Sequence, residues 1–339
     1  KILITGGSGF IGTNFVNYLS KKNKIILNID KISKESTPDK YKKIINKKNY
    51  FFLRNNLKDP MLVFKVLKKF KPNVIINFAS ESHVDRSITD PLYFIKNNIN
   101  SSSNLFYAYY MYYKIKKIKL FNVSTDEVFG SIAKGAFKET DRYNPSSPYS
   151  ASKGSIDLVA TAFNKTYKTE IKIINMVNNY GPYQFPEKLI PTIIFHYLNN
   201  KSAPIYGNGK NIREWIHVED SCDAIWKSII SKKNFMRVNI GSENCVSNLE
   251  IAKKIFKIMK SYKLTKLNLN DHIKKVNDRP GHDKRYALNS NFLKKVIKFR
   301  PKKDLYTGLT ETIFWYINNK KWLRNRLKFY KFKRLGLID

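Results

Sequence analysis

Tyr149 and Lys153 are the first residues whose types and spacing could do chemistry, in the segment Tyr149-Ser150-Ala151-Ser152-Lys153. Four residues apart at the start of a predicted helix, they share one face and lie one turn apart. A tyrosine with an ordinary pKa of about 10 is a poor base at neutral pH. A neighbouring ammonium favours the phenolate, so the pair could remove a proton from a hydroxyl group. The spacing occurs by chance in many proteins and gains meaning only beside other motifs.

A glycine-rich turn lies between the first predicted strand and the first predicted helix, as Gly6-Gly7-Ser8-Gly9-Phe10-Ile11-Gly12. Glycine lets the backbone approach a pyrophosphate, which then sits at the positive amino end of the helix. Asp30 ends the next strand about 20 residues later, where a carboxylate can bind ribose hydroxyls and would repel a 2′-phosphate. The order predicts NAD rather than NADP, although Lys31 and Lys34 weaken the distinction. An oxidised nicotinamide would add a second positive charge beside Tyr149.

Thr125, Asp126 and Glu127 follow another predicted strand directly. The Thr125 hydroxyl can hold the substrate hydroxyl that Tyr149 deprotonates. Adjacent loop carboxylates are usually solvated, but these two must lie close to the same substrate. Hydride transfer needs neither of them. Removal of water from a transient ketone needs a base for the carbon-bound proton and an acid for the departing hydroxyl. Two carboxyl groups whose environments separate their pKa values could fill those roles.

The elements that must position these residues alternate along the chain. We predict apolar strands at residues 1–4, 25–29, 74–78, 120–123 and 171–174, and helices at 13–22, 62–70, 98–113 and 151–167. Continuous apolar strands separated by helices are typical of a parallel sheet covered on both faces. The predicted fold class is therefore α/β, with a Rossmann-type doubly wound sheet. Ligands bind such sheets at the carboxyl ends of the strands, where Thr125 and Tyr149 would lie.

After Tyr180 the sequence becomes irregular and rich in proline, and two amphipathic helices follow near 220–230 and 248–262. We predict an NAD-binding domain at 1–177 that also receives segments from about 213–241. Residues 178–339 would mainly form a smaller mixed α/β lobe that faces the substrate.

Composition excludes several classes of protein. The chain has 339 residues, of which 42% are hydrophobic, enough for a large core. Only Cys222 and Cys245 are present, which predicts a reducing, cytoplasmic setting. No apolar run approaches the roughly 20 residues that cross a bilayer, and no secretory signal is visible. No histidine pair has the spacing of metal ligands, so we predict no metal site.

The net charge of +37 first suggests a nucleic-acid partner. The lysines, however, are scattered in short runs among many Asn and Ile residues, which AT-rich codons encode. Compositional drift is the favoured explanation, and nucleic acid is not an expected partner. A nonenzymatic NAD-binding module that contacts RNA stays an alternative, testable by salt-dependent binding.

Five longer segments resemble the dTDP-glucose 4,6-dehydratases, a family of extended short-chain dehydrogenases/reductases: Asn77–Ser87, Ser124–Val128, Tyr149–Gly154, Asn178–Pro191 and Asp278–Asp283. The resemblance implies that Tyr149, aided by Lys153 and Thr125, removes the C4 hydroxyl proton while hydride passes to NAD. Glu127 then takes the C5 proton, Asp126 protonates the departing C6 hydroxyl, and hydride returns to C6. The product would be a 4-keto-6-deoxy sugar used in deoxysugar (rhamnose-type) precursor synthesis.

The same resemblance implies the binding residues and a homodimer with a four-helix interface. NAD would contact Gly6, Gly9, Phe10, Ile11, Gly12, Asp30, Lys31, Asn56, Leu57, Ala79, Ser80, Ser82, Asn97, Tyr149, Lys153 and Asn179. The nucleotide-diphosphate sugar, with dTDP-glucose favoured over UDP-glucose, would contact Ser82, Thr125, Asn178, Lys188, Leu189, Pro204, Tyr206, Arg213, Asn248, Asp278, Arg279 and His282. Arg213 suits a diphosphate because its guanidinium offers paired donors; otherwise it would pair with Glu214 at the surface.

Some positions depart from the family pattern. Phe129 replaces a Tyr, Asn56 replaces an Asp expected near adenine, and the usual Tyr-Ala-Gly after Asp30 is missing. Met176 stands where Arg is common, and the loop from Gly130 to Glu139 is short. None removes a proposed catalytic group. The nearest enzymatic alternative is a nucleotide-sugar 4-epimerase, which would have little use for Asp126 and Glu127; a reductase using external NADPH fits Asp30 less well.

Overall fold

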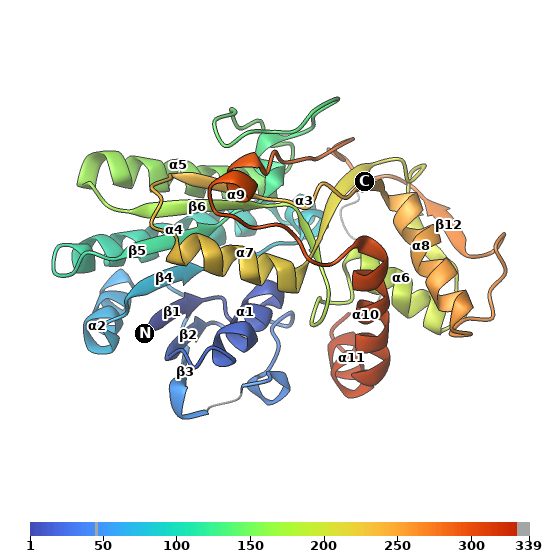
Figure 1. The fold of residues 1–339 in the computed structure, drawn as a ribbon, viewed down its shortest axis with the longest axis horizontal. Coiled ribbons are helices and arrows are strands. Elements are labelled where there is room, and N and C mark those ends of the chain that lie inside the picture. Colours follow the sequence, from blue (N-terminus) through green and yellow to red (C-terminus); the bar gives the residue numbers. More distant parts are fainter. Residues whose placement is uncertain (45–46, 331–339) are drawn as a thin grey trace.

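A seven-stranded parallel sheet forms the centre of the larger lobe (Figure 1). The computed structural model describes residues 1–44 and 47–330. The strand order is β10-β6-β5-β4-β1-β2-β3, and every neighbouring pair is parallel. The strands are β1 (Ile2–Thr5), β2 (Ile26–Asp30), β3 (Tyr50–Arg54), β4 (Val74–Asn77), β5 (Lys119–Val123), β6 (Ile171–Met176) and β10 (Arg237–Ile240).

Helices cover both faces of this sheet because its strands are apolar on both sides. In β1, Ile2 and Ile4 pack in the cluster that includes α1 (Phe10–Ser20) and α7 (Val218–Ile230). Leu3 points into the opposite cluster. That cluster is closed by α2 (Pro60–Phe70), α4 (Pro91–Tyr113) and α5 (Pro148–Tyr167). The sheet is therefore buried between two helical layers.

The smaller lobe contains two short sheets and its own core. One sheet has the order β11-β9-β7, from β7 (Asn178–Tyr180), β9 (Ile212–His217) and β11 (Cys245–Ser247). The other pairs β8 (Ala203–Tyr206) with β12 (Ile273–Val276) in parallel. The helices here are α6 (Leu189–Leu198), α8 (Asn248–Ser261), α10 (Leu305–Asn318) and α11 (Lys320–Leu327). Two short helices complete the fold: α3 (Val84–Thr89) after β4, and α9 (Asn291–Lys295) beside β10.

The predicted α/β class with a Rossmann-type parallel sheet is confirmed. Of the segments expected to return to it from about 213–241, β10 joins the sheet and α7 covers it, whereas β9 pairs in the smaller sheet. The domain division at 177 stays a prediction.

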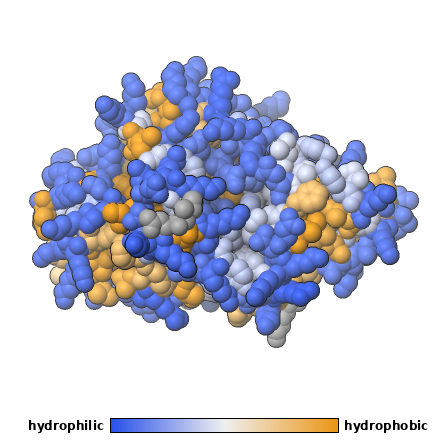
Figure 2. Space-filling model, turned by 60° about the horizontal axis from the view of Figure 1, so that its bottom comes forward, coloured by the Kyte–Doolittle hydropathy of each residue, from blue (hydrophilic) through white to orange (hydrophobic). Residues whose placement is uncertain are grey.

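The surface is mostly polar. Figure 2 shows a face on which hydrophilic side chains predominate, as 63 Lys and Arg residues against 26 acidic residues would lead one to expect. Among the helices of residues 1–44 and 47–330, none is both long and apolar enough to cross a membrane.

Candidate active site

The glycine turn joins β1 to α1 at the carboxyl edge of the sheet. Gly6 has a φ of +71°, and a Cβ there would lie 2.5 Å from the Ala79 nitrogen. A Cβ on Gly12 would lie 2.3 Å from the Gly6 carbonyl oxygen. Gly6 thus lets the ends of β1 and β4 approach, and Gly12 lets the helix start close to the turn.

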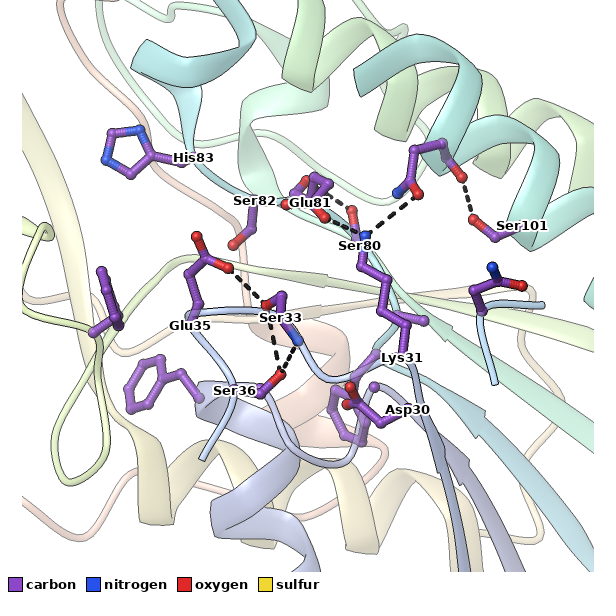
Figure 3. A pocket seen from close by; sticks show the side chains of 18 of the residues that line it. Asp30, Lys31, Ser33, Glu35, Ser36, Ser80, Glu81, Ser82, His83 and Ser101 are labelled. Atoms are coloured by element: carbon purple, nitrogen blue, oxygen red, sulfur yellow. Dashed lines mark hydrogen bonds and ion pairs between the residues drawn. The ribbon is translucent and has the colours of Figure 1, made fainter. Parts of the chain in front are cut away.

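A first cavity opens above this turn, and most predicted cofactor residues line it (Figure 3). In the figure, the segment with Ser33, Glu35 and Ser36 lies opposite Ser80, Glu81 and Ser82 across the cavity. The predicted residues on its wall are Gly6, Gly9, Phe10, Asp30, Lys31, Asn56, Leu57, Ala79, Ser80, Ser82 and Asn97. Ile11, Gly12, Tyr149, Lys153 and Asn179 are not on that wall.

Asp30 is held firmly at one end of the first cavity. Its carboxylate accepts hydrogen bonds from the backbone nitrogens of Ser8 (2.9 Å) and Ile32 (2.8 Å). The neighbouring Lys31 ammonium lies 2.5 Å from Glu81 and also donates to Tyr93. Because Lys31 forms an ion pair with Glu81, its charge argues less against a preference for NAD over NADP at Asp30 than the sequence alone suggests. Asp30 keeps a fixed acceptor on the cavity wall.

A second cavity adjoins the first, sharing the wall residues His83, Gln184, Glu187 and Lys188. The predicted substrate residues that line it are Asn178, Lys188, Leu189, Pro204, Tyr206, Arg213, Asn248, Arg279 and His282. This set comes from stretches that are far apart in the sequence. Because β8 pairs in parallel with β12, Pro204 and Tyr206 lie near the segment that carries Arg279 and His282. Glu127 also lines this cavity. Ser82 lies on the first cavity, and Thr125 and Asp278 line neither.

The start of α5 positions Tyr149 and Lys153. Pro148 occupies the first turn, and Ser147 caps the helix by accepting from the Ser150 nitrogen at 3.1 Å. The Tyr149 nitrogen donates to the Ser87 hydroxyl at 3.1 Å, which ties α5 to α3. The Lys153 ammonium donates to the Val123 carbonyl at the end of β5, at 2.7 Å.

The electrostatics of Tyr149 differ from the sequence expectation. Burial raises the pKa of Tyr149 above its ordinary value, and the nearby Glu127 and Asp126 raise it further. Only a hydrogen bond with Thr125 opposes them. Burial also lowers the pKa of Lys153 to about 8, so its ammonium is itself costly to keep. In the protein alone, Lys153 does not make Tyr149 a ready base.

Asp126 and Glu127 lie in a 3-10 turn (Asp126–Phe129) whose first residue follows the Thr125 cap. The Thr125 hydroxyl donates to Asp126 Oδ1 at 3.1 Å, while Asp126 Oδ2 is buried without a hydrogen-bond partner in the described chain. Burial and then Glu127 raise the pKa of Asp126 well above its usual value. Burial also raises the pKa of Glu127, but Arg279, Arg213 and Lys188 oppose the rise. The two neighbours therefore have different environments, with the proton favoured on Asp126.

Arg213 is buried in the second cavity and is not a surface ion pair. Its Nη2 donates to the Asp283 carbonyl at 2.9 Å, and its guanidinium lies 4.2 Å from the Tyr286 ring centre. Glu214 instead accepts backbone hydrogen bonds from Ser242, Glu243 and Leu288. The alternative of an Arg213–Glu214 surface pair is wrong.

Several residues that line the cavities were not assigned individually from the sequence. Asp85 links two residues of the second cavity that are far apart in the sequence. Its carboxylate accepts hydrogen bonds from Arg279 at 2.6 Å and from the Tyr206 hydroxyl at 2.8 Å. Arg86 pairs with both Glu35 and Glu187. The sequence signal for Asp85 and Arg86 was the family segment Asn77–Ser87, which contains both. No sequence signal indicated that Arg86 pairs with Glu35. Across the described ranges, no cluster of three His, Cys, Asp or Glu side chains could hold a metal ion.

A parallel sheet with a glycine turn at its carboxyl edge, and a buried Tyr-Lys pair at the start of α5, are features of the extended short-chain dehydrogenase/reductase class. A family model described as GDP-mannose 4,6 dehydratase matches residues 3–312. The chain is 38% identical to a probable dTDP-glucose 4,6-dehydratase of Sinorhizobium fredii, covering 100% of this chain and 99% of that one. It is 36% identical to the dTDP-glucose 4,6-dehydratase of Escherichia coli, over 100% of both chains. The chain belongs to the dTDP-glucose 4,6-dehydratase family, so the resemblance seen in the motifs is confirmed.

Solved structures agree with the sequence comparisons. A dTDP-glucose 4,6-dehydratase from Streptomyces venezuelae, solved with NAD bound, superimposes with a TM-score of 0.88 at 32% identity over 96% of this chain and 99% of that one. The corresponding enzyme from Bacillus anthracis, also in complex with NAD, gives 0.86 at 36% identity over the same shares. A UDP-glucose 4-epimerase from Thermotoga maritima, 23% identical, shares the fold with a TM-score of 0.83 over 94% and 99%.

Proposed function

We infer that the protein is an NAD-dependent hydro-lyase that converts dTDP-glucose to dTDP-4-keto-6-deoxyglucose, a precursor for deoxysugars. One observation carries the dehydration step: two adjacent carboxyl groups beside Tyr149 have different surroundings. Asp126 is buried with one oxygen lacking a hydrogen-bond partner in the described chain, whereas Glu127 lines the second cavity together with Arg213, Arg279 and Lys188. A buried, neutral Asp126 is suited to give a proton, and Glu127, which faces cationic side chains, is suited to take one.

The first cavity fits NAD. Gly6 and Gly9 bring the backbone close to the cavity, and Asp30 offers a fixed carboxylate for ribose hydroxyls. When bound, NAD would accept a hydride from the substrate and return it later in the same turnover. We propose that the full predicted set of cofactor residues contributes, with Gly12 acting through packing of α1.

Tyr149 would remove the C4 hydroxyl proton, with Thr125 holding that hydroxyl and Lys153 supplying positive charge. Glu127 would then take the C5 proton, which the C4 ketone has made acidic. Asp126 would protonate the C6 hydroxyl, so that the C6–O bond breaks and water leaves. After hydride reaches C6, Glu127 returns a proton to C5. Tyr149 releases the proton that it took and Asp126 takes one up from solvent, so the enzyme regains its starting state without net oxidation.

The second cavity would hold the nucleotide diphosphate. Around it lie the buried Arg213 and the partly buried Arg279 and Lys188, and all three act on Glu127 electrostatically. Guanidinium groups offer paired donors to phosphate oxygens. We propose the predicted substrate set as the binding residues, with Asp278 acting through His282, which it contacts at 2.6 Å.

We also propose a homodimer with a four-helix interface built from α4 and α5 of each copy. These helices pack on each other and present exposed, largely apolar side chains at Leu92, Ile95, Tyr107, Leu158 and Tyr167. An exposed apolar surface of this kind is typical of an interface.

Product analysis tests the proposal. The purified protein is incubated separately with dTDP-glucose and UDP-glucose, and the products are identified by mass spectrometry. The proposal predicts loss of one water from dTDP-glucose, with UDP-glucose turned over more slowly. An isomeric hexose would indicate a 4-epimerase and contradict it.

A further inference from the structure

A buried chain of hydrogen bonds crosses the carboxyl edge of the sheet beneath the two cavities. The Thr5 hydroxyl donates to Asn77 Oδ1 at 2.6 Å, and Asn77 Nδ2 donates to Asn122 Oδ1 at 2.8 Å. Asn122 Nδ2 then donates to Asp157 Oδ1 on α5 at 3.0 Å. These four side chains are at most 1% exposed. The chain links the strand before the glycine turn to the helix that carries Lys153.

Asp157 receives hydrogen bonds from three side chains. Besides Asn122, the Ser124 hydroxyl donates to Asp157 Oδ2 at 2.5 Å and the Tyr143 hydroxyl donates to it at 3.0 Å. An ionised carboxylate is an acceptor only, whereas a protonated one must also donate. The Asn122 amide can only donate, and the two hydroxyls can donate as well, so all three groups can stabilise the ionised carboxylate in this buried place.

Lys153 lies one helical turn before Asp157 on the same face of α5. Burial lowers the pKa of Lys153, and the charge of Asp157 opposes this effect. Burial raises the pKa of Asp157 in turn, and Ser124, Lys153, Tyr143 and Arg237 oppose the rise. Arg237 on β10 also faces the Lys153–Asp157 pair. Its guanidinium lies 4.6 Å from the centre of the Tyr143 ring, whose hydroxyl binds Asp157.

We propose that Asp157 is a positioning residue: its carboxylate, held by the buried chain from Thr5, keeps Lys153 protonated from one helical turn away. By binding Asn122 and Ser124 on either side of Val123, it also fixes the carbonyl to which Lys153 donates. It touches neither cavity, so it acts through Lys153. The proposal rests on the proposed role of Lys153 in the dehydration.

The first test measures protonation of Lys153 without turnover. NAD-saturated protein carrying 15N at the lysine side-chain nitrogens is titrated by NMR, and the Lys153 signal is assigned by its loss in Lys153→Met. In Asp157→Asn the apparent pKa of Lys153 should fall by about one unit or more, a tenfold change in proton affinity. Asp157→Glu, which keeps the charge, should restore most of it. An unchanged Lys153 pKa in Asp157→Asn would overturn the proposal.

The second test is the pH dependence of kcat. In Asp157→Asn, the fall in kcat on the alkaline side should begin at lower pH, while kcat at about pH 6 stays within roughly twofold of the wild type. A loss of equal size at every pH would mean a merely structural role and would overturn the proposal. Ser124→Ala removes one donor and should move the alkaline limb in the same direction by less, which covers the case that Asp157→Asn does not fold. A wild-type protein without dehydratase activity would contradict the proposed function, whereas the NMR result would still decide the role of Asp157.

Discussion

At the scale of single residues, the site depends on what surrounds each group more than on its type. Asp126 and Glu127 are adjacent in the chain, yet only Glu127 faces three cationic side chains. The residue types and their place after β5 were predictable from the sequence. The direction of Lys153, toward Val123 rather than Tyr149, was not, because it depends on how closely α5 packs against the end of β5. The burial of Arg213 over Tyr286 likewise needs residues that are far apart in sequence.

Glu127→Gln should separate the first step from the second. The amide cannot take the C5 proton, so exchange of that proton with solvent should stop and kcat should fall by about 100-fold or more. Reduction of bound NAD by dTDP-glucose should continue, because Tyr149, Lys153 and Thr125 are intact. Absorbance of the reduced nicotinamide and deuterium incorporation at C5 measure the two steps. Normal turnover by the variant would show that Glu127 is not the base.

The pH dependence of wild-type activity should be bell-shaped. Glu127 acts as a carboxylate, so activity is lost as the pH falls through its pKa, which lies above the usual value. Two groups contribute to the alkaline loss: Asp126, which acts as an acid and has a pKa well above its usual value, and Lys153, whose ammonium is lost as the pH rises through its pKa of about 8. Asp126→Asn removes that acid, so its remaining activity should lack the alkaline fall due to Asp126. The profiles of kcat against pH for the wild type and this variant provide the measurement.

At the scale of elements, most strands of the large sheet were predictable, because β1, β2, β4, β5 and β6 are rich in Ile, Leu, Val and Phe and almost wholly buried. β3 was missed because Tyr50–Arg54 is an edge strand with half-exposed aromatic residues, so it lacks a buried pattern. α6 was missed because prolines suggested irregular structure. Pro191 is the third residue of α6, in the first turn, where a missing backbone N–H costs little.

The segment Ser33–Ser36, which lines the first cavity, is held by hydrogen bonds from α11, which lies far away in the sequence. The Arg326 guanidinium donates to the carbonyls of Lys34 and Ser36, next to the cavity residues Ser33 and Glu35. Arg326→Met should therefore weaken NAD binding by about tenfold, since hydrogen bonds to a charged group contribute roughly 1.5–3 kcal/mol.

Titration calorimetry of the cofactor-free protein with NAD measures this effect. Arg324→Met is the matched control, because Arg324 lies on the same helix but is exposed. If both variants bind NAD like the wild type, α11 does not hold the cavity segment in place.

At the scale of the whole molecule, the net charge of +37 opposes the association of two copies, whereas the apolar face of α4 and α5 favours it. Like charges repel two copies, so an interface between them has to be apolar. Leu158 is 59% exposed and Tyr107 is 46% exposed on that face. The face could not be read from the sequence, because the hydrophobic pattern does not tell a buried core from a subunit contact.

Placing Glu at both Leu158 and Tyr107 should convert the proposed dimer to monomers by burying like charges in the interface. Sedimentation velocity measures the result. Leu269→Glu is the control, since Leu269 is 63% exposed but lies outside α4 and α5. A wild-type monomer, or a double variant that remains dimeric, would contradict the interface.

The central claim is that Tyr149, Asp126 and Glu127 together produce loss of water without net oxidation. The most direct measurement follows deuterium from C4 of labelled dTDP-glucose, with no NAD added beyond the amount that saturates the protein. We expect a 4-keto-6-deoxy product with the deuterium in its C6 methyl group, because the same hydride leaves C4 and returns to C6. A product without deuterium at C6, or an isomeric hexose with the label still at C4, would contradict it.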